Sequence, residues 1–454
     1  MRRFGAVVLL ILLASGAAWL APAEAWAAPV RMSLAEAIRR ARENPLARAA
    51  REQEHAAAAR ADEARSLRWP RITLNAFVAP SPEVECLNAD CTRTAPDDFQ
   101  LTVAGVFGGA RLELAQPIYT FGKIDSAIAA AGHAVGMQSA LADGVVEDVA
   151  LETARAYLGV RYAREIEAML ADGIEQVKKA EETLSERLAK GDSEVTVQDR
   201  LRLSTFAAEV QIRLSQAREK GGVALAGLRA LVGEAEADTS EEQFEAMQID
   251  LARIESHLSR ARERRAEWRA AREGVKALGE RTKMEQARFW PDLLAVGALG
   301  IMRATAVDNP PSAFANDPFN TDRAEVALLL RWSFDVGQWA RVDGARAEQG
   351  RGKALLEVAE ATAEFKVREA YQQAIEARAR LEAARGGERS ARGWVASVAQ
   401  ADAVGVVSAR DIADAYLAYF TLRSRTLESI YDWNFAIAAL GRATGTLLTT
   451  FEQH

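Results

Sequence analysis

The chain has 454 residues, with 57 Lys and Arg against 64 Asp and Glu, which gives a net charge of -7. Binding a nucleic-acid backbone needs a basic surface, and no basic stripe is present, so we expect no nucleic-acid partner. A hydrophobic content of 49% and only 12 Pro exclude a disordered or linker-rich chain. Aromatic residues make up only 7%, whereas Ala and Arg dominate long stretches, a composition suited to long helices packed on small side chains.

The N-terminus has the pattern of a secretory signal peptide. Arg2 and Arg3 precede an apolar run over residues 6–13, and small residues then offer cleavage after Ala25 or Ala27. An uncleaved anchor is the alternative, but the apolar run is short for a membrane-spanning helix. We therefore expect residues 1–27 to be a signal peptide and the protein to be exported.

Later apolar runs have the length of membrane strands rather than membrane helices. The longest uninterrupted run covers residues 293–302. A membrane-spanning helix needs about 20 apolar residues, whereas a membrane β-strand needs about 9 to 11. The sequence therefore excludes a helical membrane protein and leaves room for membrane strands.

The two cysteines, Cys86 and Cys91, lie in a segment rich in turn-forming residues. In an oxidising compartment they could close a small disulfide loop. Metal binding by the pair is the alternative, but two thiols without a nearby His or second pair make a poor site. We expect the disulfide.

An internal repeat organises the chain. The string R-W-P-R-I at residues 68–72 is matched by F-W-P-D-L at 289–293, 221 residues later. A glycine follows the extended segments in each half, and the next matching glycine comes 69 residues later in the first half (122–191) and 68 later in the second (337–405). Such agreement is hard to obtain by chance. We expect one protomer built from two similar halves, residues 28–245 and 246–454.

Each half has the same expected order: helix, two strands, long helix, shorter helix. In the first half the opening helix begins at Ser33, where Glu36 completes a capping box, and ends before Trp69. The strands, long helix and shorter helix are then expected at about 71–79, 99–119, 122–191 and 195–231. The matching elements of the second half are expected at about 292–302, 323–334, 337–405 and 408–440.

Apolar and polar residues alternate most clearly in the last strand. Val326, Leu328 and Leu330 fall on one face, and Glu325 and Arg331 on the other. The long helices, by contrast, carry apolar residues at three- and four-residue spacing without an interrupting Pro. At 1.5 Å per residue each would be about 100 Å long, several times the diameter of a small domain.

Aromatic residues gather where the strands meet the helices. A layer of such residues would mark one bilayer interface, and the alternative is a set of core aromatics at the end of a soluble sheet. We favour the interface, because four strands between very long helices have no obvious soluble partner. Since four strands cannot close a barrel and lipid forbids open edges, several chains must share one barrel. The six aromatics are Trp69, Tyr119, Phe121, Trp290, Trp332 and Trp339.

Three segments carry a resemblance to a known family: S-L-A-E-A-I-R-R-A-R-E-N-P from residue 33, L-E-L-A-Q-P-I-Y-T-F-G-K over 112–123 and G-V-V-S-A-R-D-I-A-D over 405–414. They resemble the repeated signatures of the outer-membrane efflux proteins, the TolC family. It implies a mainly α-helical fold in which long antiparallel helices form a periplasmic α-barrel. It also implies a homotrimer in which each protomer gives four strands to one outer-membrane β-barrel.

Four carboxylates are candidates for a periplasmic gate. Asp411 and Asp414 are three residues apart on a predicted helix, so they share one face, and in a trimer they would form rings of negative charge. The resemblance assigns an aspartate pair at this place to the constricted periplasmic entrance, with Asp199 as the matching acid of the first half. Asp402 stands where the family has a Tyr. A solvated helix face is the alternative, and we hypothesise a cation-selective gate.

No catalytic, cofactor or metal pattern is present in the sequence. The four histidines, His55, His133, His257 and His454, lack ligand-like spacing, and no phosphate-binding loop or nucleophile motif occurs. We therefore expect a protein that is not an enzyme and that needs no cofactor.

These features together indicate an outer-membrane exit duct that extends into the periplasm. The resemblance implies a tripartite efflux pump, in which an adaptor (membrane fusion protein) joins the duct to an inner-membrane transporter, or a type I secretion system. The alternative from another class is a periplasmic coiled-coil adaptor or scaffold without a pore, although such a protein should not need strands of membrane length.

Overall fold

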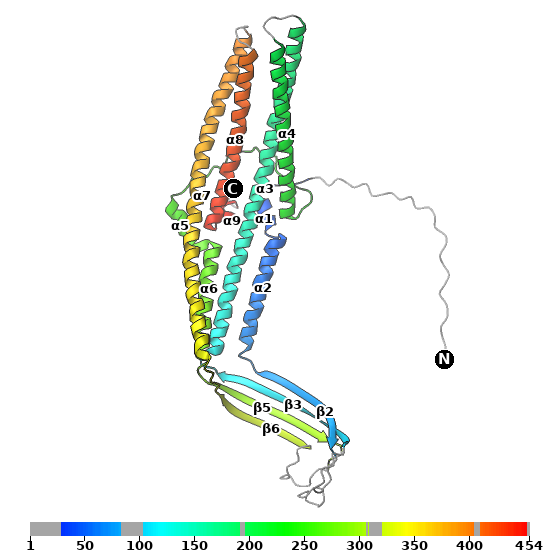
Figure 1. Ribbon diagram of the computed structural model, residues 1–454, viewed down its shortest axis with the longest axis vertical. Helices are drawn as coiled ribbons and strands as arrows, with labels where there is room; N and C mark the ends of the chain where they lie inside the picture. The colour runs from blue at the N-terminus through cyan, green and yellow to red at the C-terminus, as the bar shows by residue number, and fades with distance from the viewer. Residues whose placement is uncertain are drawn as a thin grey trace, which may run out of the picture.

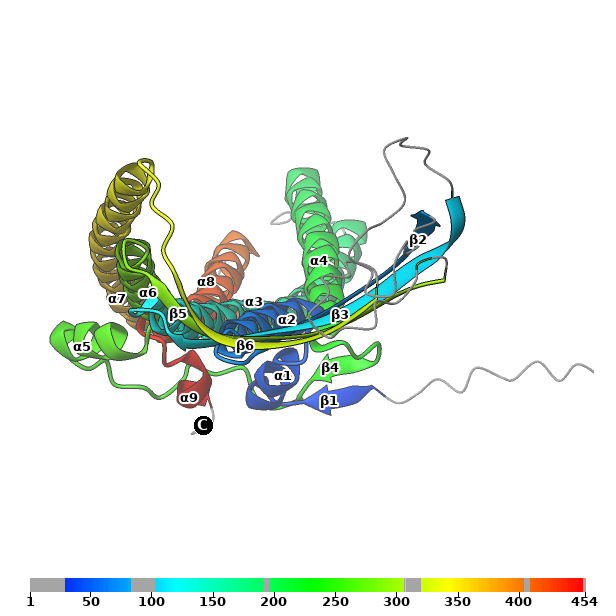
Figure 2. The same ribbon diagram turned by 90° about the horizontal axis from the view of Figure 1, so that it is seen from below.

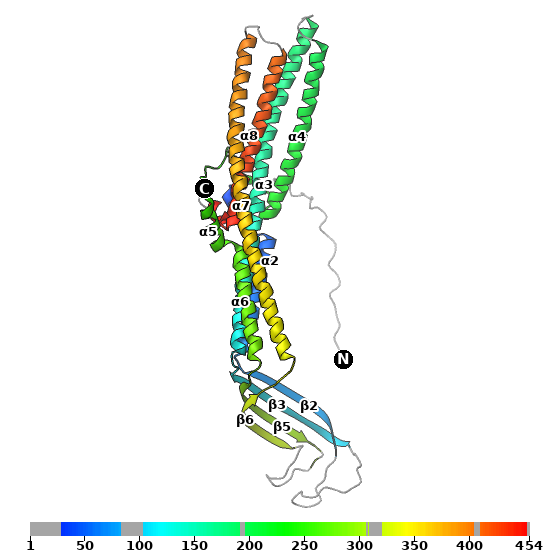
Figure 3. The same ribbon diagram turned by 60° about the vertical axis from the view of Figure 1, so that its left-hand side comes forward.

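The computed structural model describes residues 29–82, 103–190, 196–305, 307, 320–403 and 409–451. It is an elongated wall of long helices with a four-stranded sheet at one end (Figures 1 and 3). The signal peptide over 1–27 and the pair Cys86 and Cys91 lie outside the described residues, so both remain predictions.

The expected long helices are confirmed. α3 (Lys123–Ala189) and α7 (Gln338–Ala403) have 67 and 66 residues, and each is followed by an antiparallel partner, α4 (Val197–Val232) and α8 (Ala409–Thr444). These pairs form two helical hairpins whose tips lie side by side at the end farthest from the sheet (Figure 1).

Nearer the sheet, shorter helices replace the hairpin partners. α2 (Pro45–Ser66) packs on α3, and α6 (Ala266–Ala287) packs between α3 and α7. In the half of the wall that contains the tips, α3 lies between α4 and α8. α3 is thus the central rod of both halves, which explains why buried residues recur over most of its length, from Ala140 to Leu184.

The expectation of one helix from Ser33 to residue 67 is wrong. Ser33 caps α1 (Leu34–Ala41) by accepting a 3.2 Å hydrogen bond from the Glu36 amide. The chain then breaks, and Asn44 caps α2 by accepting a 2.9 Å bond from the Leu46 amide. Its side-chain nitrogen also donates to the carbonyl of Leu231, so the break fixes α1 and α2 against the end of α4.

A small layer on the outer side of the wall was not predicted. β1 (Val30–Met32) pairs in parallel with β4 (Ala237–Thr239), and α5 (Ile254–Arg264) and α9 (Leu447–Phe451) lie on the same convex side (Figure 2). Tyr157 of α3 holds this layer: its hydroxyl lies within hydrogen-bonding distance of the Met32 carbonyl (3.2 Å) and Ser240 Oγ (3.0 Å).

A charge cluster around the buried guanidinium of Arg442 joins three helices. Arg442 of α8 lies 2.7 Å from Asp148 of α3 and 2.7 Å from Glu267 of α6, and 3.4 Å from Glu147 of α3. Burial raises the pKa of Glu147 to about 7, although the charge of Arg442 acts in the opposite direction. The same guanidinium therefore faces three carboxyl groups, and only the other two accept hydrogen bonds from it.

The sheet has four antiparallel strands in the order β2 (Arg71–Pro82), β3 (Val103–Tyr119), β5 (Asp292–Ala304) and β6 (Thr321–Arg331). The strands begin and end close to the expected positions. β2 runs three residues beyond its expected end at 79, and β6 stops three residues short of its expected end at 334. β6 ends at Arg331, because the chain turns toward α7, where Asp335 accepts a 2.9 Å hydrogen bond from the Gly337 amide.

Candidate functional site

The two faces of the sheet differ in chemistry. Strand register places apolar side chains in cross-strand rows on one face, such as Leu112, Leu299 and Ala324, and we call this the leucine face. The adjacent rows place charged side chains on the opposite face, such as Glu113 and Glu325, and we call this the charged face. The predicted alternation along 325–331 is confirmed, since Val326 and Leu328 belong to the leucine face.

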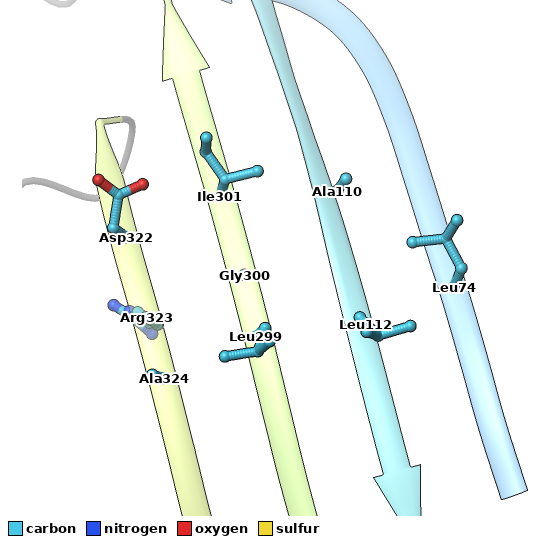
Figure 4. A pocket seen from close by; sticks show the side chains of 9 residues that line it. All are labelled: Leu74, Ala110, Leu112, Leu299, Gly300, Ile301, Asp322, Arg323 and Ala324. Atoms are coloured by element: carbon cyan, nitrogen blue, oxygen red, sulfur yellow. The ribbon is translucent and has the colours of Figure 1, made fainter.

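The leucine face is convex. The sheet bends as seen from below (Figure 2), and side chains on the outside of a bend have more open space around them. Val326 on the leucine face is 92% exposed, whereas Leu329 on the charged face is 42% exposed and Leu294 only 6%. Four leucine-face side chains from three strands line a shallow depression (Figure 4): Leu74, Leu112, Leu299 and Ile301. An exposed apolar surface of this kind matches lipid rather than water.

The aromatic side chains lie at the junction between sheet and helices, as expected. Tyr119 packs edge-on against Phe121, with ring centres 4.7 Å apart, and Phe121 stacks on Trp290 at 5.6 Å. Trp290 is thereby joined to the end of the neighbouring strand β3. This first aromatic group comes from both halves of the chain.

A second aromatic group includes two residues that the sequence did not single out. The ring of Trp339 lies 5.4 Å from Phe289 and 5.3 Å from Phe334. Trp332 donates a 3.1 Å hydrogen bond from its indole nitrogen to the carbonyl of Phe289. Trp69 lies outside both groups, and its side chain is 74% exposed.

The position of these aromatic side chains beside the sheet supports an interfacial role, because amphipathic rings prefer the boundary between lipid and water.

The turn into the first long helix needs a special backbone. Phe121 and Gly122 both have positive φ, 51° and 88°, so two successive left-handed residues turn β3 into α3. The matching Gly337 in the second half has no positive φ. The two glycines correspond in sequence, but the backbone between strand and helix has a different conformation in each half.

Asp411 and Asp414 lie in the first turns of α8, and both are exposed. The carboxylate of Asp414 is 3.9 Å from the guanidinium of Arg410. The backbone of Asp402 belongs to the end of α7, so the three residues flank one hairpin tip.

Asp199 lies at the other tip and has a structural role. Its carboxylate accepts hydrogen bonds from the Thr196 amide (3.0 Å) and hydroxyl (2.6 Å), while its own amide donates to Thr196 Oγ1. These bonds lower the pKa of Asp199. This is a capping box at the start of α4. The structure brings the tips to the same end of the wall (Figure 1).

The described histidines have no metal-like surroundings. His133 Nδ1 lies 2.7 Å from a carboxylate oxygen of Glu273, and His257 is buried against the ring of Tyr371. Among the described residues, no group of three or more His, Cys, Asp or Glu side chains could hold a metal ion. Likewise, none of the helices in the described part of the chain is both long and apolar enough to cross a membrane.

Comparison with known proteins identifies the fold. The fold matches the solved CmeC outer-membrane channel of Campylobacter jejuni, with a TM-score of 0.75 at 16% identity over 91% of this chain and 86% of that one. It also matches the outer-membrane protein VceC of Vibrio cholerae, with a TM-score of 0.73 at 17% identity over 91% of this chain and 96% of that one. The open state of MtrE from Neisseria gonorrhoeae matches with a TM-score of 0.73 at 17% identity, over 91% of this chain and 89% of that one. No curated protein matches the chain in sequence.

The fold is therefore that of an outer-membrane channel subunit. Residues 257–446 match the family model described as outer membrane efflux protein. It is an outer-membrane protein whose helical part extends into the periplasm. The alternative of a pore-free periplasmic scaffold is not favoured, since the protein has the fold of the channels themselves.

Proposed function

We propose that three copies of this chain close one exit duct across the outer membrane. The observation that carries the proposal is the open wall: β2 and β6 are the outer strands of the sheet, and each has one strand edge without a partner among the described residues. Because lipid contains no hydrogen-bonding groups, such edges need partner strands. β2 of one copy would pair with β6 of the next, and the charged face would line the lumen.

The duct would act passively and take its driving force from other proteins. An adaptor and an inner-membrane transporter would engage the helical tips, as the family resemblance implies. A wide, water-filled lumen lined by the charged face suits polar cargo. Export of unfolded protein in a type I secretion system is the second use of the same duct.

The tips would form the gate. Asp411 and Asp414 from three copies would gather six carboxylates at the periplasmic end, and Asp402 and Asp199 would add to the negative field there. Asp199 contributes its charge while it caps α4. Opening would require the two hairpins, α3–α4 and α7–α8, to separate at their tips.

One experiment tests both proposals. The purified protein is first assayed for heat-resistant trimers and then for conductance in planar bilayers. We expect trimers, discrete channels and cation preference, and Asp411→Asn with Asp414→Asn should reduce that preference. The control is Asp62→Asn with Glu63→Gln, an exposed acidic pair on α2, which should leave selectivity unchanged. Monomers without conductance would refute the duct, and an unaltered double Asn variant would refute the gate.

A further inference from the structure

Two adjacent cross-strand rows on the charged face carry opposite charge. In one row Arg111 of β3 pairs with Gly300 of β5, which pairs with Arg323 of β6. In the next row toward the helices, Glu113, Ala298 and Glu325 occupy the same three strands. The sheet therefore presents an arginine row and, about 6 to 7 Å nearer the helices, a glutamate row, since each strand residue advances about 3.3 Å.

Small residues on β5 leave the space between these charges open. Gly300 has no heavy atom within 4 Å of the position that a Cβ would take. Arg111 consequently reaches over β5: its guanidinium lies 2.8 Å from Glu113 on its own strand and 3.8 Å from Glu325 two strands away. Asn75 and Thr73 of β2 extend the two rows with neutral polar groups.

These charges remain accessible to solutes. The side chains of Arg111, Glu113 and Glu325 are about half exposed, and exposed ion pairs of this kind add little to stability. Within the described residues, Arg323 has no ion pair. Stabilisation of the sheet therefore does not account for the two rows. Both rows lie on the face of the sheet that would line the lumen.

We propose that the two rows form an ion-selectivity band in the lumen of the sheet, separate from the carboxylates at the tips. This rests on the proposed function, because the band acts only when copies close around a lumen. The ligands are small charged solutes: the arginine row attracts anionic groups and the glutamate row cationic groups, so a dipolar solute is oriented as it passes. With two Arg and two Glu in each copy, the rows are balanced, and neutralising either one leaves a net charge of defined sign.

The test is the reversal potential of the assembled protein in planar bilayers under a KCl gradient. Arg111→Gln with Arg323→Gln should raise the ratio of potassium to chloride permeability several-fold. Glu113→Gln with Glu325→Gln should lower the ratio, and the combination of all four should return it close to the wild-type value. Each pair is also measured in the Asp411→Asn, Asp414→Asn background, so that the tips do not dominate the result.

Two controls separate charge from structure. Arg303→Gln with Asp322→Asn neutralises an ion pair between β5 and β6 of the same sheet on the leucine face, where the groups lie 2.9 Å apart, and should not change the ratio. Arg111→Lys with Arg323→Lys keeps the charge and should behave as wild type. Equal ratios in all variants, or shifts in the same direction for both rows, would overturn the band. A wild-type protein without conductance would instead overturn the proposed duct, a failure visible before any variant is made.

Discussion

Lys123, in the first turn of α3, donates a 2.7 Å hydrogen bond to Asp292, the first residue of β5, and a second one of 2.7 Å to the carbonyl of Trp290. The contact joins the long helix of the first half to the strand of the second half. Both side chains are only 20% exposed, so the pair is shielded from solvent more than most ion pairs of this protein. It fixes where the sheet begins relative to the helices.

Loss of this contact should loosen the junction. Lys123→Met removes both hydrogen bonds and leaves a partly buried carboxylate without its partner, so we expect the free energy of unfolding to fall by about 1 to 3 kcal/mol. The matched control is Arg68→Met, which breaks the ion pair with Asp125 at the same junction, where both groups are largely exposed. That loss should be at most about 1 kcal/mol. Thermal unfolding of the assembled protein gives both values, and equal losses would contradict the role assigned to Lys123.

The two repeat glycines should respond differently to a methyl group. Gly122→Ala forces an alanine into the left-handed region and should destabilise the protein by about 1 to 2 kcal/mol. Gly337→Ala introduces the same methyl group where φ is not positive, with Asp335 no closer than 3.4 Å, and should have little effect. The thermal midpoints of the two variants test this, and the reverse order would disprove it.

Glu147 should make stability depend on pH. Its pKa is raised from 4.5 to about 7 by burial. The stability that the protonated carboxyl group contributes to the folded state is therefore fully present below about pH 4.5 and is lost as the pH rises through 7. Glu147→Gln removes this titration. The thermal midpoint of the wild type should therefore fall relative to that of the variant between pH 4.5 and 7.5. A constant difference over that range would show that Glu147 does not titrate in the folded protein.

Glu267 provides the opposite case in the same cluster. Burial raises its pKa, but the hydrogen bond and charge of Arg442 outweigh burial, so the net effect is a lowered pKa. Its contribution is present above about pH 4.5 and is lost as the pH falls. Glu267→Gln should thus be most destabilising near neutrality and less so in acid, measured by the same thermal unfolding.

The capping box at the tip of α4 should hold its first turn. Thr196→Ala removes the hydroxyl that binds both the amide and the carboxylate of Asp199, a loss of about 1 kcal/mol for a helix cap. We expect faster amide hydrogen exchange over 197–200 and unchanged exchange at the start of α8. Thr196→Ser retains the hydroxyl, so the amides over 197–200 of this variant should exchange at the wild-type rate.

Long periodic elements could be predicted from the sequence because one local pattern persists over many turns or strand residues. The helices from Lys123 and Gln338 and the four strands were expected within a few residues of where they lie. The break at Asn44 was missed although Asn followed by Pro is a helix-start signal. Its cause is partly tertiary, since Asn44 also binds Leu231, far away in the chain.

Other features depend on contacts that no local pattern contains. β1 and β4 have three residues each and pair across 207 positions, Val30 with Ala237. The cluster around Arg442 joins residues 147, 148 and 267, which are ordinary surface-type residues in sequence. The aromatic junction was found because its residues recur in both halves, whereas Phe289 and Phe334 were not singled out. The aspartates proposed for the gate were named through the family resemblance, and the structure adds their place at one end of the wall.

The near-equal lengths of α3 and α7 limit how this protein can change in evolution. A single inserted residue would advance one tip by about 1.5 Å and rotate everything beyond it by about 100°, which would take Asp411 or Asp199 away from its side of the duct. An insertion that keeps the wall intact would have to occur in both helices of both hairpins. It would also have to add about seven residues to each helix, because seven residues make nearly two full turns and leave the side chains facing almost the same way. The lengths of α3, α4, α7 and α8 should therefore change together. Relatives with a longer or shorter helical wall should differ by insertions or deletions of equal length in all four helices.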